Sequence, residues 1–129
     1  MKTILIVEDE FDLLQSLSLA LEIEGYKILT AGNGRTALEL LKEIKPDLVI
    51  TDVMMPYVSG YELSEALSRM PGYESVPSVL MSAMDRHMHP KGPWKALLAK
   101  PFTIDRLVKV VTELIGTPDQ SHRIEPAKE

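Results

Sequence analysis

Short apolar runs that alternate with helix-like patterns constrain the fold of this 129-residue chain more than any other feature. The runs at 3–7, 48–50, 78–82 and 96–99 are continuous and short, which is typical of strands covered on both faces. A weaker run at 27–31 is typical of an edge strand. This alternation predicts a parallel sheet with right-handed crossovers, that is, a doubly wound α/β layer sandwich.

Apolar side chains also recur at helical spacing between these runs, and each stripe predicts a helix packed on the sheet. Gly25 is placed to end the first helix, Asn33 to begin the second, and Thr103 with Asp105 to begin the last. The side chains expected in the core are Leu14, Leu17 and Leu21; Ala37, Leu41 and Ile44; Leu63, Ala66, Leu67 and Met70; and Ile104, Leu107, Val108, Val111, Leu114 and Ile115.

One crossover departs from this pattern. The segment MDRHMHPKGPWK, at 84–95, should supply a helix but holds Pro90, Gly92 and Pro93 within four residues. A proline inside a helix costs about 3 kcal/mol. We therefore expect the fourth helix to be short, irregular or missing.

Composition narrows the class of protein. The 14 basic and 19 acidic side chains leave a net charge of −5, which disfavours nucleic acid or an anionic membrane as the main partner. The chain has no cysteine, as is typical of a reducing compartment, and we expect a cytoplasmic protein. The opening MKTILIVEDEF is too short in apolar sequence for a signal peptide or a membrane span. We expect one domain at 1–116 and a polar tail or the start of a linker at 117–129.

Polar and charged side chains stand where the expected strands end. Because ligand sites in open α/β sheets lie outside the carboxyl ends of the strands, we expect these side chains at one edge of the sheet. They are Glu8 and Asp9, Asp52, Ser82 and Lys100. Three neighbouring carboxylates repel one another unless a cation offsets their charge, and oxygen ligands suit Mg²⁺. With an ammonium and a hydroxyl nearby, the Asp52 carboxylate is placed to become an aspartyl-phosphate.

Four motifs in order carry a family resemblance. ED at 8–9, DVMMPYVSGYEL at 52–63, SA at 82–83 and KPF at 100–102 resemble the receiver domain of bacterial two-component response regulators, over about residues 2–116. The resemblance implies a CheY-like fold: a flavodoxin-like three-layer sandwich around a five-stranded sheet of order 2-1-3-4-5. It also implies a signalling phosphoacceptor that assists its own phosphorylation and dephosphorylation and is not a conventional enzyme.

The resemblance also implies residue roles at the acidic edge. Asp52 is the phosphoacceptor, and Mg²⁺ is held by Asp9, Asp52 and the backbone carbonyl of Met54. Glu8 acts through a metal-bound water, and Lys100 contacts the phosphoryl group. The bond between Lys100 and Pro101 is expected to be cis.

Ser82 and Leu97 are the switch positions that the resemblance implies. Ser82 is expected to bond a phosphoryl oxygen. Leu97 departs from the family pattern, because many receivers carry Tyr or Phe three residues before the lysine. We therefore expect the phosphorylation-driven conformational switch of this chain to be atypical.

The partner that the resemblance implies is a sensor histidine kinase or a histidine phosphotransfer protein, and a homodimer is compatible with it. The main alternative is a pseudo-receiver, an interaction module that keeps the shape with little or no phosphorylation. A flavin mononucleotide carrier is disfavoured because the acids of EDEFD, at 8–12, would repel its phosphate. An aspartyl-phosphate hydrolase is disfavoured because no second acid follows two residues after Asp52. His87 and His89 lack a third metal ligand, and His122 lies in the polar tail.

Overall fold

The computed structural model describes residues 1–84 and 89–118, which fold around one five-stranded parallel sheet. The strand order is β2-β1-β3-β4-β5, as the resemblance implies. In chain order the elements are β1 (Thr3–Val7), α1 (Phe11–Glu24), β2 (Lys27–Ala31), α2 (Gly34–Glu43), β3 (Leu48–Asp52), α3 (Gly60–Arg69), β4 (Ser78–Ser82), β5 (Ala96–Ala99) and α4 (Ile104–Ile115).

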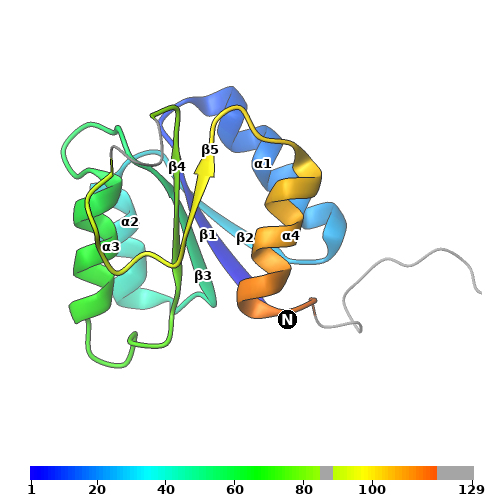
Figure 1. Ribbon diagram of the computed structural model, residues 1–129. Coiled ribbons are helices and arrows are strands. Elements are labelled where there is room, and N and C mark those ends of the chain that lie inside the picture. The colour runs from blue at the N-terminus through cyan, green and yellow to red at the C-terminus, as the bar shows by residue number, and fades with distance from the viewer. Residues whose placement is uncertain (85–88, 119–129) are drawn as a thin grey trace, which may run out of the picture.

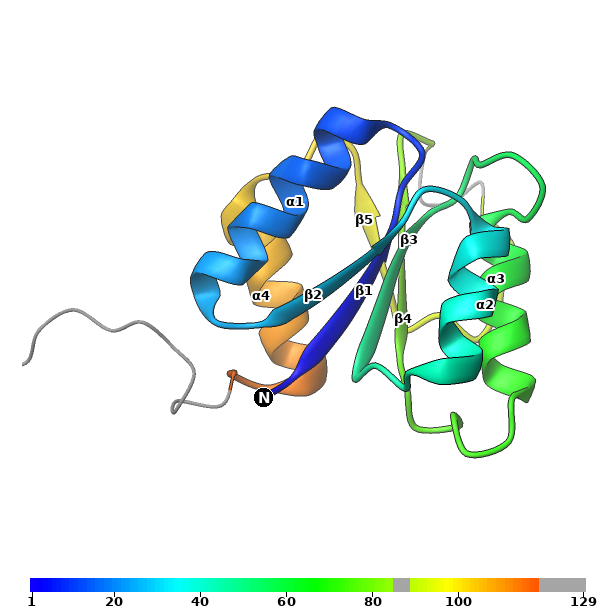
Figure 2. The same ribbon diagram turned by 180° about the vertical axis from the view of Figure 1, so that it is seen from behind.

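Helices cover both faces of the sheet, so the three-layer α/β sandwich is confirmed. Helices α1 and α4 lie on one face, and α2 and α3 lie on the other (Figures 1 and 2). Alternate residues of β1 enter the two cores: Ile4 and Ile6 pack with α1 and α4, and Leu5 and Val7 pack with α2 and α3. A strand whose two faces are both buried must be apolar throughout, which explains the continuous apolar run.

The ends of the helices follow the signals in the sequence. Gly25 ends α1 with a φ of 109°, a left-handed conformation that glycine adopts without steric cost. The side chain of Asn33 accepts a hydrogen bond from the Thr36 N–H at 2.8 Å, and Thr103 accepts one from the Arg106 N–H at 3.0 Å. These three predicted ends are confirmed.

The prediction that Ile44 and Ile104 lie in the core is wrong. Ile44 is 41% exposed, because α2 ends at Glu43 and the backbone of Ile44 is extended. Ile104 is 47% exposed at the first residue of α4, where the helix has not yet turned its apolar face to the sheet. Val110 is buried on that helix instead. Ala66 is only partly buried. The remaining stripe residues are buried or packed against the two cores.

The described residues of the crossover between β4 and β5 are irregular, as expected. No helix is present in its described residues, 83–84 and 89–95. His87 lies outside the described residues, as do His122 and all of the expected tail after Pro118. Within the described part of the chain, no helix is long and apolar enough to cross a membrane.

Candidate functional site

The strand register brings the predicted site residues to one edge of the sheet. Val7 pairs with Thr51, Asp52 pairs with Met81, and Ser82 pairs with Ala99. Each polar residue therefore stands at, or directly after, the last paired residue of its strand. The carboxyl edge of the sheet is the point at which the chain gathers these groups.

Lys100 joins two acids from different strands. Its Nζ lies 3.1 Å from Oε1 of Glu8 and 3.0 Å from Oδ1 of Asp52. The two acids are buried, whereas the lysine side chain is 24% exposed. The partly exposed ammonium of Lys100 therefore offsets the negative charge of two buried carboxylates, which lie at the ends of two strands.

Asp9 completes an acidic cluster. One carboxylate oxygen from each of Glu8, Asp9 and Asp52 lies within 4.8 Å of the other two. Asp9 is exposed, so the cluster opens to solvent on that side. Three carboxylates against one lysine leave surplus negative charge at this edge, and a set of oxygen donors suits a hard divalent cation. The donor set therefore fits a metal ion.

Burial of Glu8 is the main reason that its pKa is raised above the ordinary value of 4.5. A hydrogen bond that its Oε2 accepts from the Glu10 N–H, at 3.1 Å, lowers the pKa in part. The charge of Asp52 raises it again, and the contact with Lys100 lowers it. Because the net shift is upward, folding disfavours the ionised form of Glu8 relative to the protonated form.

The pKa of Lys100 is raised although burial by itself would lower it. Hydrogen bonds to Asp52 and Glu8, together with the charges of these acids, outweigh the loss of hydration. The lysine is therefore held in its charged form. A charged, partly exposed ammonium is available to a second anion that enters the site.

Ser82 is buried beside this cluster at the end of β4. Its backbone carbonyl accepts a hydrogen bond from the Lys100 N–H at 2.7 Å, and its hydroxyl oxygen accepts one from the Met84 N–H at 3.0 Å. The hydroxyl oxygen thus holds the first residues of the β4–β5 loop.

Gly60 fixes the end of β3 against the first turn of α3. A Cβ atom at this position would lie 2.3 Å from the carbonyl oxygen of Asp52, so no larger residue fits there. The Gly60 N–H also donates to the Val53 carbonyl at 2.9 Å. Nothing in the local sequence pattern reveals this contact of Gly60 with Asp52.

The other predicted site positions are Met54 and Leu97. Met54 follows Asp52 by two residues, and its side chain is 72% exposed. Leu97 lies in β5, pairs with Leu80 and is half-buried. The bond between Lys100 and Pro101 is cis, as expected.

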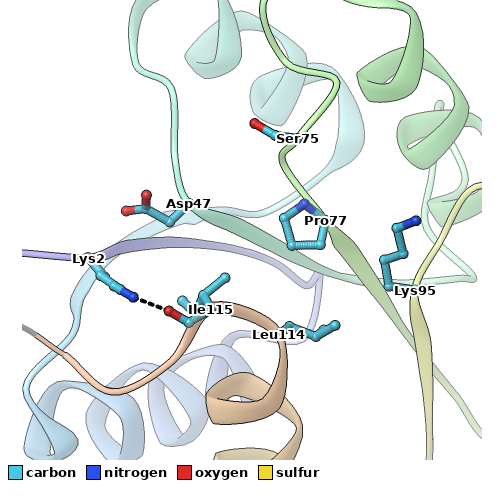
Figure 3. A pocket seen from close by; sticks show the side chains of 7 residues that line it. All are labelled: Lys2, Asp47, Ser75, Pro77, Lys95, Leu114 and Ile115. Atoms are coloured by element: carbon cyan, nitrogen blue, oxygen red, sulfur yellow. Dashed lines mark hydrogen bonds between the residues drawn. The ribbon is translucent and has the colours of Figure 1, made fainter.

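A cavity of about 410 Å³ lies at the opposite end of the sheet, away from the acidic cluster. Figure 3 shows its lining, which includes Lys2, Asp47, Ser75 and Lys95. The Nζ of Lys2 donates to the Ile115 carbonyl, and the Asp47 carboxylate accepts from the Thr3 N–H at 2.8 Å. The charges of Lys2 and Asp47 are therefore already bonded to main chain and leave little to attract a ligand. We therefore take the carboxyl edge of the sheet, where the acids gather, as the candidate site.

Comparison with known proteins identifies the family of the chain. Residues 4–112 match the family model of the response regulator receiver domain. DivK, a polar-differentiation response regulator of Brucella anthropi, is 28% identical over 119 residues, which are 89% of this chain and 97% of DivK. The probable transcriptional regulatory protein TcrX of Mycobacterium tuberculosis is 36% identical over 111 residues, which are 82% of this chain and 46% of TcrX.

A solved structure is similar over most of the chain. The response regulator TrrA of Thermotoga maritima, in complex with Mg²⁺ and BeF, has a TM-score of 0.81 and 33% sequence identity. The similarity covers 88% of this chain and 99% of the TrrA chain. The match of the family model to most of the chain, together with this shared fold, leads to one conclusion: the chain belongs to the response regulator receiver domain family of two-component signalling.

Proposed function

We propose that Asp52 accepts a phosphoryl group from a phosphohistidine of a sensor histidine kinase or a histidine phosphotransfer protein, in a reaction that depends on Mg²⁺. The observation that carries this proposal is the position of Asp52: a buried carboxylate, 3.0 Å from the Lys100 ammonium and inside a cluster of three acids. We assign the receiver domain to 1–116 and a tail or linker start to 117–129.

Transfer requires one bond to form and one to break. A carboxylate oxygen of Asp52 forms a bond to phosphorus as the bond from phosphorus to the donor imidazole nitrogen breaks, and the imidazole keeps that electron pair. Lys100 already binds Asp52, so its ammonium is placed to stabilise the added oxygen charges. The Ser82 hydroxyl is assigned to one of the phosphoryl oxygens. The domain thereby assists its own phosphorylation. The same groups assist dephosphorylation, in which a water oxygen bonds to phosphorus, the bond from phosphorus to the Asp52 oxygen breaks, and phosphate leaves.

Asp9, Asp52 and the backbone carbonyl of Met54 would hold the Mg²⁺, and Glu8 would act through a metal-bound water. When bound, the ion would supply positive charge to the phosphoryl oxygens. The three acids offer oxygen donors within 4.8 Å of one another, which fits this role. The complex of TrrA with Mg²⁺ and BeF supports the choice of metal by similarity.

Of the two switch positions, Ser82 and Leu97, we assign the response to the phosphoryl group to Ser82 alone. Leu97 is half-buried in the edge strand and has no hydroxyl or ring with which to respond to the position of Ser82. We therefore assign the movement that follows to the β4–β5 loop, which begins directly after Ser82.

Intact-mass spectrometry tests the phosphoacceptor. We expect the native chain, treated with acetyl phosphate and Mg²⁺, to gain the mass of one phosphoryl group, and Asp52→Asn to gain none. Asp47→Asn is the matched control, because Asp47 lies at the other end of the sheet, and it should be labelled like the native chain. A native chain that stays unlabelled would favour the pseudo-receiver.

A further inference from the structure

Helix α3 is joined to the β4–β5 loop by three aromatic side chains. The Tyr61 hydroxyl lies 2.5 Å from Nδ1 of His89. The Tyr61 ring centroid lies 5.8 Å from that of His89 and 5.3 Å from that of Trp94. We call Tyr61, His89 and Trp94 the aromatic latch. Figure 1 shows the chain that leads into β5 passing beside α3.

The latch is a packed contact. Nε2 of His89 is buried and has no hydrogen-bond partner among the residues that the structure describes, so water does not reach this side of the ring. A Cβ atom on Gly92 would lie 2.0 Å from the Trp94 ring, so a glycine is needed for the ring to lie against the backbone. In a crossover that has no described helix, these contacts attach the loop to α3.

Both sides of the latch lead to the candidate site. Tyr61 directly follows Gly60, whose Cα hydrogens face the carbonyl of Asp52 without room for a methyl group. The loop begins at Ser82, whose hydroxyl oxygen accepts from the Met84 N–H, and β5 leads from the loop to Lys100. The latch therefore connects the element packed on the phosphoacceptor to the loop between two other site residues.

We propose that the aromatic latch is coupled to phosphorylation of Asp52 and opposes it. This inference rests on the proposed function. A Ser82 hydroxyl that turns to a phosphoryl group releases the Met84 N–H and draws the start of the loop toward the site, whereas the latch holds the loop on α3. Coupling between two equilibria is reciprocal. If the phosphorylated geometry shifts the latch toward its open state by some factor, opening the latch shifts the protein toward the phosphorylated geometry by the same factor.

Tyr61→Phe tests the latch in the full chain, because it keeps the ring and removes the hydroxyl. Without ligand, we expect exchange of the Lys95 amide, whose N–H donates to the Ser78 carbonyl at 2.8 Å, to become about fivefold faster, as loss of one neutral hydrogen bond implies. With Mg²⁺ present, we expect affinity for beryllium fluoride to rise about fivefold by the same reasoning. Tyr73→Phe is the matched control: it loses a tyrosine hydrogen bond to the Leu41 carbonyl, and both measurements should stay native.

His89→Phe removes the other half of the hydrogen bond and keeps an aromatic ring. Since both variants remove one bond, the double variant should match either single variant. Trp94, the chain's one tryptophan, reports the state of the latch by its fluorescence, which should change when the native chain binds beryllium fluoride.

A native exchange rate of the Lys95 amide in Tyr61→Phe would overturn the latch. An affinity for beryllium fluoride that is unchanged or lower in Tyr61→Phe would overturn the coupling, and so would additive effects in the double variant. Failure of the proposed function would give a different result: the native chain would bind beryllium fluoride no better than Asp52→Asn. That result would also overturn the coupling. The exchange rates measured without ligand would still decide whether the latch holds the loop.

Discussion

At the carboxyl end of the sheet, Glu8 and Asp52 share the single ammonium of Lys100, whereas at the amino end Lys2 and Asp47 each bind main chain. Both ends therefore carry acids and lysines. At the amino end each of these two charges has its own partner nearby. At the carboxyl end the acids outnumber the lysine, and burial raises the pKa of Glu8.

This difference separates a structural arrangement from a reactive one. Charges that bind main chain hold elements together and leave little to attract a ligand. Carboxylates gathered around one shared lysine leave charge that a cation can offset, and an ammonium that a phosphoryl group can share. The excess of acid over base at one edge is thus the physical basis of the proposed function, and it can be tested by removing charges from each end.

The largest effect is expected from Lys100→Met in metal-free buffer. The variant leaves two buried carboxylates without their ammonium, and we expect the free energy of unfolding to fall by about 3 kcal/mol, near the low end for a broken buried pair because the lysine is partly exposed. Urea denaturation at neutral pH measures the change. Lys95→Met, at the amino end, is the control and should change stability little. Equal losses in the two variants would contradict the comparison.

A smaller effect is expected from Mg²⁺. At a concentration ten times its dissociation constant, an ion that binds only the folded chain raises the free energy of unfolding by about 1.4 kcal/mol. We expect this gain in the native chain and in Asp47→Asn, and its loss in Asp9→Asn measured at the same Mg²⁺ concentration. Thermal unfolding with and without Mg²⁺ gives the result. A full gain in Asp9→Asn would remove Asp9 from the proposed metal ligands.

The smallest effect is a dependence of stability on pH. Because folding raises the pKa of Glu8, the unfolded chain loses the proton of the Glu8 carboxyl at a lower pH than the folded chain does. As the pH rises from 4.5, the free energy of unfolding therefore falls, until the pH passes the pKa of Glu8 in the folded chain. In metal-free buffer, Glu8→Gln should remove this decline. Asp47→Asn should keep it. If the pH profile of urea unfolding is the same in the native chain and in Glu8→Gln, folding does not raise the pKa of Glu8.

Much of the candidate site could be predicted because a parallel sheet converts position in the chain into position in space. Glu8, Asp52 and Ser82 each follow an apolar run, and the carboxyl ends of parallel strands must meet at one edge. The cation that the acids suggested is supported by the close approach of their oxygens. The errors at Ile44 and Ile104 arose at helix ends, where spacing along the chain no longer says which way a side chain points.

The aromatic latch could not have been predicted in this way. Tyr61 and Trp94 belong to segments without a common period, and the prolines near Trp94 indicated only that a helix was unfavourable. Packing of a loop on a helix depends on the path of the loop through space, which short-range pattern does not specify. The contact of Gly60 with Asp52 is similar, since it depends on how α3 meets the end of β3.

The amino-acid sequence by itself determined the alternation of strands and helices, most of the core, and the delivery of acids, a serine and a lysine to strand ends, because these follow from periodicity and from the geometry of parallel strands. Only the tertiary structure decided that Lys100 binds Glu8 and Asp52 together and that the β4–β5 loop is attached to Tyr61. Those contacts join residues far apart in the chain, and their distances depend on how all the layers pack at once.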